Sequence, residues 1–248
     1  MLASVFILIW SADTFAYFSG KLFGRTKFFE RVSPNKTWEG FAGALIFTLA
    51  IAAVLSYYLD FLNLYQWLGF GLVVLIFGFT GILGKLITIP SDQLVWYRML
   101  FATLSIGLYL ILKKQSAIMP KKGAVQTFFT GFIIAAHWIF FFEAIKQSNV
   151  SLTLSALATA SLFTALLEPL FFKRKVQAYE LFLGSLVLIG LYFIFQFEAE
   201  NSFGIVLAVA SAFLASLFTV INGKLIKQYN STRISLYELG GGTVGITI

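Results

Sequence analysis

The chain has 248 residues, of which 59% are hydrophobic and 18% aromatic, while only 12% are charged. An ordinary soluble domain carries about 25% charged residues, and 29 phenylalanines are too many for a soluble core of this size. This composition excludes an ordinary soluble domain and predicts an integral membrane protein surrounded by a lipid bilayer. The net charge of +7 comes from basic residues scattered between apolar segments, which argues against nucleic acid as a partner.

The absence of cysteine excludes disulfides and thiolate metal sites. The opening segment, Met1–Trp10, has neither a basic leader region nor a small-residue cleavage site, so we interpret it as part of a membrane span. We expect the protein in a bacterial inner (plasma) membrane.

Continuous apolar segments of about 20 residues predict membrane-spanning helices rather than barrel strands. The fold class is therefore an all-α integral membrane protein, a polytopic bundle of about eight spans. A truncated ninth begins near Ser235 and is too short to cross. Since the loops are short, we expect consecutive spans to be antiparallel neighbours. The eight spans are predicted at residues 1–19, 38–59, 67–87, 94–112, 124–145, 150–172, 178–197 and 203–226.

An internal repeat links two distant parts of the chain. Residues 79–87 return 139 positions later as residues 218–226, with seven of nine residues identical. Each copy ends a long apolar segment. Because such self-similarity marks repeat architectures, one multi-helix unit is predicted to start near residue 68 and a second near residue 201.

A basic loop at residues 20–37 leads into the second predicted span. Thr37 can cap that helix, and Glu39 lies in its first turn, where the helix dipole favours an anion. Lys36 and nearby free amides could hold a phosphate, and Asp13 is an ionisable group inside a span. The alternative is a solvated cytoplasmic loop followed by a capped helix.

Two motifs around this loop resemble the phosphatidate cytidylyltransferase (CDP-diacylglycerol synthase) family. They are D-x-x-A-Y-x-x-G-x-x-F-G at Asp13–Gly24 and S-P-N-K-T-W-E-G at Ser33–Gly40. The resemblance covers residues 1 to about 75. It implies a helical bundle that joins CTP to phosphatidic acid at a magnesium-dependent cytoplasmic site. The phosphate- and nucleotide-binding residues would be Asp13, Ser33, Asn35, Lys36, Thr37 and Glu39.

The resemblance is partial, because the amino-terminal spans of that family and its carboxy-terminal signature are missing. That signature, H-G-G followed by D-R-x-D, supplies the aspartates that bind metal. A Mg²⁺ held between phosphates usually needs one or two protein carboxylates, and Asp13 with Glu39 is a weak substitute. We therefore predict no catalytic residues, no metal site and no enzyme activity here, with Mg²⁺ as a cofactor only if the cytidylyltransferase interpretation holds.

The longer second part resembles the drug/metabolite transporter superfamily, EamA type. The matching segments, in order, are Gly78–Lys85, Trp96–Ala102, His137–Ile145 and Ser151–Leu170, followed by a basic turn at Lys173–Lys175. The resemblance implies ten spans in two five-span repeats. Since five is odd, the second repeat must insert upside down. We divide the chain into residues 1–75 and 76–248, the latter holding one repeat and the start of another.

Charge distribution gives conflicting orientations for the two parts. In the second part, the basic loops fall on one side of the membrane, which the positive-inside rule assigns to the cytoplasm. The same rule places loop 20–37 in the cytoplasm. Span 38–59 would then place residues 60–66 outside the cytoplasm, whereas the second part places them inside. The two parts therefore require opposite sides for residues 60–66. A splice between two unrelated genes would produce this conflict.

Five residues are our candidates for lining a solute site: Arg98, His137, Trp138, Glu143 and Glu168. Four of the five have a structural alternative. Arg98 could meet a substrate anion or Glu168, or anchor at the interface. His137 and Trp138 could be a packing pair, and Glu168 could pair with Lys173 or Arg174 at the interface.

The sequence therefore favours an incomplete transporter of a small organic solute. We expect it to need no cofactor, and a homodimer is its candidate assembly. The second interpretation is a cytidylyltransferase that lacks its metal-binding signature. The third is a non-functional fusion of two gene fragments, which the topology conflict favours. The solute, its direction and any coupling ion are not specified by the sequence.

Overall fold

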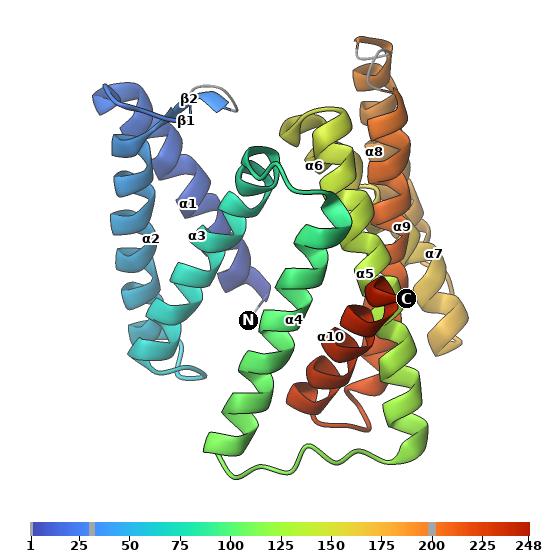
Figure 1. Cartoon of the computed structure of the whole chain (residues 1–248). Coiled ribbons are helices and arrows are strands. Elements are labelled where there is room, and N and C mark those ends of the chain that lie inside the picture. The colour runs from blue at the N-terminus through green and yellow to red at the C-terminus, as the bar shows by residue number, and fades with distance from the viewer. Residues whose placement is uncertain (1, 30–32, 198–201) are drawn as a thin grey trace. The chain divides into compact units, whose positions relative to one another are not determined.

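The computed structural model describes residues 2–29, 33–197 and 202–248, and it divides the chain into two compact units, Met1–Ile87 and Thr88–Ile248. Most of the described chain is helical (Figure 1). The predicted all-α polytopic membrane fold is confirmed, because five described segments are long and apolar enough to cross a bilayer and two shorter helices are also apolar. The five are Trp38–Tyr58, Ser91–Leu112, Lys121–Gln147, Val150–Phe172 and Ser202–Leu225.

The first unit contains three helices and a small β-hairpin. Its elements are α1 (Leu2–Phe23), β1 (Lys27–Phe29), β2 (Ser33–Thr37), α2 (Trp38–Tyr58) and α3 (Leu64–Leu86). The two strands are antiparallel, with Lys27 opposite Thr37. We predicted a loop for this stretch. The hairpin was not predictable because the strands are very short and β2 contains residues with low β-propensity.

Helices α1 and α2 approach closely because glycines lie between them. A Cβ on Gly40 would lie 2.7 Å from the carbonyl oxygen of Ala16, and one on Gly43 would lie 2.0 Å from Oγ of Ser19. Small residues at a helix interface let the two backbones pack closely in a membrane. This crossing holds the beginning of α2 against α1, and it thereby positions the loop that precedes α2.

The second unit is built around α5. Its helices are α4 (Ser91–Leu112), α5 (Lys121–Gln147), α6 (Val150–Leu157), α7 (Ala160–Phe172), α8 (Ala178–Phe197), α9 (Ser202–Leu225) and α10 (Ser231–Thr247). Helix α5 packs against α4, α9 and α10. Half of the apolar stretch of α5 is buried inside the protein, compared with 22% of the apolar stretch of α4. Among the five long apolar segments, α5 is therefore the one most enclosed by neighbouring helices.

Helix α10 packs against α4 and α5 rather than chiefly against α9, its neighbour in sequence (Figure 1). Our expectation that consecutive helices are spatial neighbours is therefore wrong at this position. The reason is steric. A Cβ on Gly131 of α5 would lie 2.0 Å from the carbonyl oxygen of Glu238, and one on Gly241 would lie 2.2 Å from that of Phe128. These glycines give α10 and α5 a close backbone contact that α9 does not offer.

The predicted span at 150–172 is divided into α6 and α7. At the junction, the amides of Ala158 and Thr159 bond to carbonyls three residues earlier, at 3.2 and 3.1 Å, which tightens the turn as in a 3₁₀ helix. From α9, the hydroxyl of Ser216 donates to the carbonyl of Ala160 at 2.8 Å. This hydrogen bond joins the start of α7 to α9.

The ends of two helices are separated by the same number of residues as the two copies of the sequence repeat. Helix α3 ends at Leu86 and α9 at Leu225, 139 positions apart. The amide of Ile87 donates to the carbonyl of Leu83 at 3.0 Å, and the corresponding amide of Ile226 donates to that of Asn222 at 2.9 Å. The two copies therefore end their helices in the same register.

Candidate functional site

A cavity of about 500 Å³ lies in the second unit among α5, α7 and α9. Small-molecule pockets usually measure about 300–1,000 Å³, so this cavity could hold a small organic molecule. A neighbouring pocket of about 340 Å³ shares Phe171, Lys224 and Gln228 with it. The cavity is lined by Lys122, Gln126, Phe129, Thr130, Ile133, Phe171, Ile221, Lys224, Leu225 and Gln228.

Helix periodicity explains how these side chains converge. On α5, Lys122, Gln126 and Thr130 are four residues apart and therefore share one face. Lys224 and Gln228 have the same spacing, at the end of α9 and just after it. The cavity thus has polar groups on two sides, and Phe129, Ile133, Phe171, Ile221 and Leu225 supply its apolar lining.

The cavity and its neighbour are cationic. Lys122 and Lys224 line the cavity, and Lys173 and Lys227 line the neighbouring pocket with Lys224. No carboxylate is among the described residues that line either one. The shared lining also places the three basic loops at one end of this unit, in agreement with the charge argument. Such a site suits a ligand with a negative group and an apolar body.

Of the five predicted solute-site residues, the structure brings Arg98 and Trp138 together. The guanidinium carbon of Arg98 lies 4.6 Å from the Trp138 ring centroid and 4.9 Å from that of Phe142. Cation–π contacts of this length stabilise a positive charge. Among the described residues, Arg98 forms no ion pair, and the suggested contact with Glu168 is absent, because that carboxylate binds another arginine.

His137 and Glu143 each take part in hydrogen bonds between helices. His137 is buried, and its Nδ1 lies 2.9 Å from the backbone oxygen of Ser211 on α9. Glu143 accepts from the hydroxyl of Ser91 at 2.8 Å and from the amide of Gln147 at 2.7 Å. These contacts join α5 to α9 and to the start of α4, and they match the packing alternative for His137.

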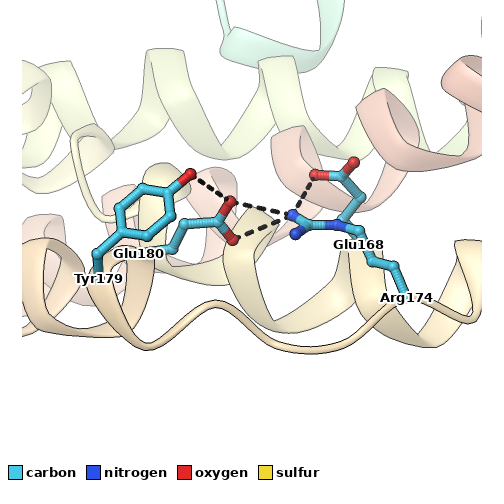
Figure 2. Close-up of polar contacts among 4 residues, drawn as sticks. All are labelled: Glu168, Arg174, Tyr179 and Glu180. Atoms are coloured by element: carbon cyan, nitrogen blue, oxygen red, sulfur yellow. Dashed lines mark hydrogen bonds and ion pairs between the residues drawn. The ribbon is translucent and has the colours of Figure 1, made fainter.

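Glu168 belongs to an ion-pair cluster at the turn between α7 and α8 (Figure 2). Nη2 of Arg174 lies 2.9 Å from Oε2 of Glu168 and 3.0 Å from Oε2 of Glu180. The hydroxyl of Tyr179 donates to Oε1 of Glu180 at 3.3 Å. Glu180 and Glu168 raise the pKa of Arg174 above its ordinary value. This cluster is the interface pairing that we considered as the alternative for Glu168.

None of these five residues is among the described residues that line the cavity. Our sequence analysis missed Lys122, Gln126, Thr130 and Gln228. The signal that could have found them is a polar side chain at every fourth position on α5 and again around the end of α9.

The first unit presents a second candidate site at the start of α2. Oγ1 of Thr37 accepts from the amide of Gly40 at 3.1 Å, which confirms the predicted cap. The carboxylate of Glu39 accepts from the amide of Thr26 at 3.2 and 3.3 Å, and the amide of Trp38 donates to the Thr26 carbonyl at 3.0 Å. The residues after α1 are thereby bonded to the first turn of α2.

Lys36 and Asp13 are electrostatically coupled within this unit. Partial burial lowers the pKa of the Lys36 ammonium, although the residue keeps exposed surface, and the nearby charge of Asp13 opposes that change. The side chains of Ser33 and Asn35, two predicted nucleotide-site residues, lie outside the described part of the structure. Asp13, Lys36, Thr37 and Glu39 therefore carry the described part of this site.

The described donor groups of the first unit do not fit a magnesium ion. No cluster of three or more His, Cys, Asp or Glu that could hold a metal occurs among the described residues. Glu39 already accepts two hydrogen bonds from the Thr26 amide. A site built on the remaining Asp13 lacks the carboxylate pair that the cytidylyltransferase resemblance implies.

Two protein-family models match the chain and overlap. The model described as the EamA-like transporter family matches residues 63–196, more than half of the chain. The model described as the cytidylyltransferase family matches residues 1–88, somewhat beyond the resemblance seen in the motifs. Both matches include α3, whose range is 64–86.

Curated relatives fall into the same two classes. The phosphatidate cytidylyltransferase of Haemophilus influenzae is 48% identical over 58 residues, which are 23% of this chain and 20% of that protein. The enzyme of the same name from Staphylococcus haemolyticus is 44% identical over 82 residues, 33% of this chain and 31% of that protein. The uncharacterized transporter YxxF of Bacillus subtilis is 26% identical over 179 residues, 69% of this chain and 57% of that protein.

The chain therefore spans about a fifth to a third of the length of these cytidylyltransferases and somewhat more than half of the transporter. No solved structure matches it.

Proposed function

Because the chain belongs to the EamA-like transporter family, we propose that it moves a small organic solute across a bilayer through the cavity of its second unit. We propose further that this solute carries a negative group on an apolar body. The bacterial relatives favour the bacterial inner membrane as its location. A homodimer and the absence of any cofactor remain part of the proposal.

The observation that carries this proposal is the cavity among α5, α7 and α9. Its volume suits a small solute, its lysines attract an anion, and its aromatic and aliphatic residues offer apolar contact.

A ligand panel tests the proposed solute class. Thermal unfolding of the purified protein would be followed with small arylcarboxylates and with the matching neutral amides. We expect the carboxylates to raise the melting temperature, because only a bound ligand shifts the folding equilibrium. The double substitution Lys122→Gln and Lys224→Gln should remove this effect.

Lys175→Gln is the matched control, since this lysine is exposed at the same end of the unit but lines neither pocket. Equal stabilisation by the amides, or a carboxylate effect that survives the double substitution, would argue against an anionic solute.

Phosphatidate cytidylyltransferase activity is the second candidate function, and the identity of 40–48% over the first residues favours it. We expect no CDP-diacylglycerol from CTP and phosphatidic acid, with or without added Mg²⁺, because the described residues hold no cluster of carboxylates that could bind a metal. Product that forms with the intact chain and disappears with Lys36→Ala would establish this activity instead. The third interpretation, a non-functional fusion of two gene fragments, predicts neither activity.

A further inference from the structure

A buried carboxylate lies at the contact between α9 and α10. Glu238 is 5% exposed, and its neighbour is Asn222 of α9, whose Nδ2 donates to Oε2 of Glu238 at 3.3 Å. Neither residue lines the cavity described above. Ionisable side chains inside a membrane bundle are rare and usually functional.

Both side chains have an oxygen that lacks a hydrogen-bond partner. Oε1 of Glu238 and Oδ1 of Asn222 are buried, and neither accepts a hydrogen bond from the described residues. Both atoms are acceptors when Glu238 is ionised, so they cannot satisfy each other. Leaving two buried acceptors unpaired is unfavourable, and so is burying a carboxylate without a counter-charge.

The surroundings offer Glu238 no such counter-charge. Among the described residues, no ion pair includes it. On α4, Arg98 lies over the rings of Trp138 and Phe142. On α5, His137 contacts Ser211. Lys224 of α9 lies 5.9 Å from the Phe171 ring centroid.

The remaining charged groups of these helices lie near helix ends. They are Asp92 of α4, Lys121, Lys122, Glu143 and Lys146 of α5, and Arg233 of α10. Tyr237 on α10 packs in an apolar cluster with Met119, Leu225 and Ile234.

We propose that Glu238 and Asn222 form a proton-binding site. Glu238 carries a proton on Oε1, and this O–H group donates a hydrogen bond to Oδ1 of Asn222. The Asn222 amide continues to donate to Oε2, so a carboxylic acid and a carboxamide pair reciprocally. The proton comes from water and neutralises the carboxylate, and no other bond changes. One proton thereby satisfies both orphaned oxygens and removes the buried charge.

Infrared spectroscopy of the purified protein in liposomes tests this assignment directly. At neutral pH, the wild type should show the carbonyl stretching band of a protonated carboxylic acid, and Glu238→Gln should lack it. Asn222→Leu should keep the band but shift it to higher frequency, because the acid carbonyl oxygen Oε2 loses the hydrogen bond that the Asn222 amide donates. Glu168→Gln is the control, since an ionised carboxylate paired with Arg174 contributes no such band.

The dependence of stability on pH gives a second, independent measurement. The unfolded chain releases the Glu238 proton at a lower pH than the folded site does. As pH rises from the first of these two pH values to the second, unfolding is therefore increasingly favoured. Glu238→Gln should lose this slope and remain folded, since an amide supplies the same donor permanently.

Three outcomes would overturn the proposal: spectra of wild type and Glu238→Gln that coincide in the acid region, an unchanged slope in the variant, or stabilisation by sodium ions in a protein that shows no acid band. None of these readouts depends on transport, so failure here leaves the proposed solute site to be judged separately.

Discussion

Ser211 and His137 bond to each other across the contact between α9 and α5. The Ser211 hydroxyl donates to the carbonyl of His137 at 3.0 Å, and an Nδ1–H tautomer of His137 donates to the carbonyl of Ser211 at 2.9 Å. Both side chains are buried. This reciprocal pair gives the bundle a specific register between two helices that are otherwise mainly apolar at their contact.

Ser211→Ala should destabilise the protein by about 1–3 kcal/mol, because it removes a buried hydroxyl from this pair. The measurement is the free energy of unfolding in detergent micelles. Ser185→Ala is the control: its exposed hydroxyl bonds to the carbonyl of Phe182 at 2.7 Å, and we expect a change within about 0.5 kcal/mol. Equal effects at the two positions would contradict a specific role for the pair.

Gly131→Ala should disrupt the contact between α5 and α10. The added Cβ would lie 2.0 Å from the backbone oxygen of Glu238, and backbone cannot move aside cheaply. Overpacking of this kind costs about 1–3 kcal/mol or more. At Gly107, a Cβ meets nothing within 4 Å, so Gly107→Ala should be neutral or slightly stabilising. Thermal unfolding of both variants is the measurement, and a tolerated Gly131→Ala would refute this close packing.

Arg174→Ala should destabilise the protein only slightly, despite the two ion pairs of Arg174. The three side chains of the cluster remain 22–38% exposed, and such pairs contribute little when water screens them. The loss should shrink in 1 M salt, where screening is stronger. A loss that is several-fold larger and independent of salt would mean that the cluster is shielded in the membrane.

Thr37→Ala should weaken the start of α2 by about 1 kcal/mol, since the side-chain acceptor for the Gly40 amide disappears. Thr37→Ser keeps that acceptor and should retain most of the stability. Hydrogen exchange at the first turn of α2 can distinguish the two variants. If both exchange equally fast, the cap does not stabilise this turn.

Composition and the apolar runs were sufficient to predict the helices. Apolar runs predicted every long described helix, and Asn63 followed by Gln66 is readable as the capping box that begins α3. The break at Ala158–Thr159 was not predictable from a run that stays apolar on both sides. A side chain 56 residues away, Ser216, bonds beside it to the carbonyl of Ala160, and sequence spacing does not show that contact.

The candidate sites were harder to predict because side-chain partners are set by packing. The charge of Glu168 suggested either a solute contact or a pairing with Arg174, and the structure contains the pairing. Glu238 was overlooked, although it is a lone carboxylate in a run of otherwise uncharged residues. Its importance depends on burial against Asn222, which sequence spacing does not show.

Uptake into proteoliposomes tests the central claim most directly. Vesicles containing the wild-type chain should accumulate a radiolabelled arylcarboxylate faster than protein-free vesicles. Gln126→Trp should abolish that uptake by filling the cavity, whereas Phe101→Trp, at an exposed position on α4 outside the cavity, should preserve it. Uptake no faster than in protein-free vesicles, or uptake unaffected by Gln126→Trp, would contradict transport through this cavity.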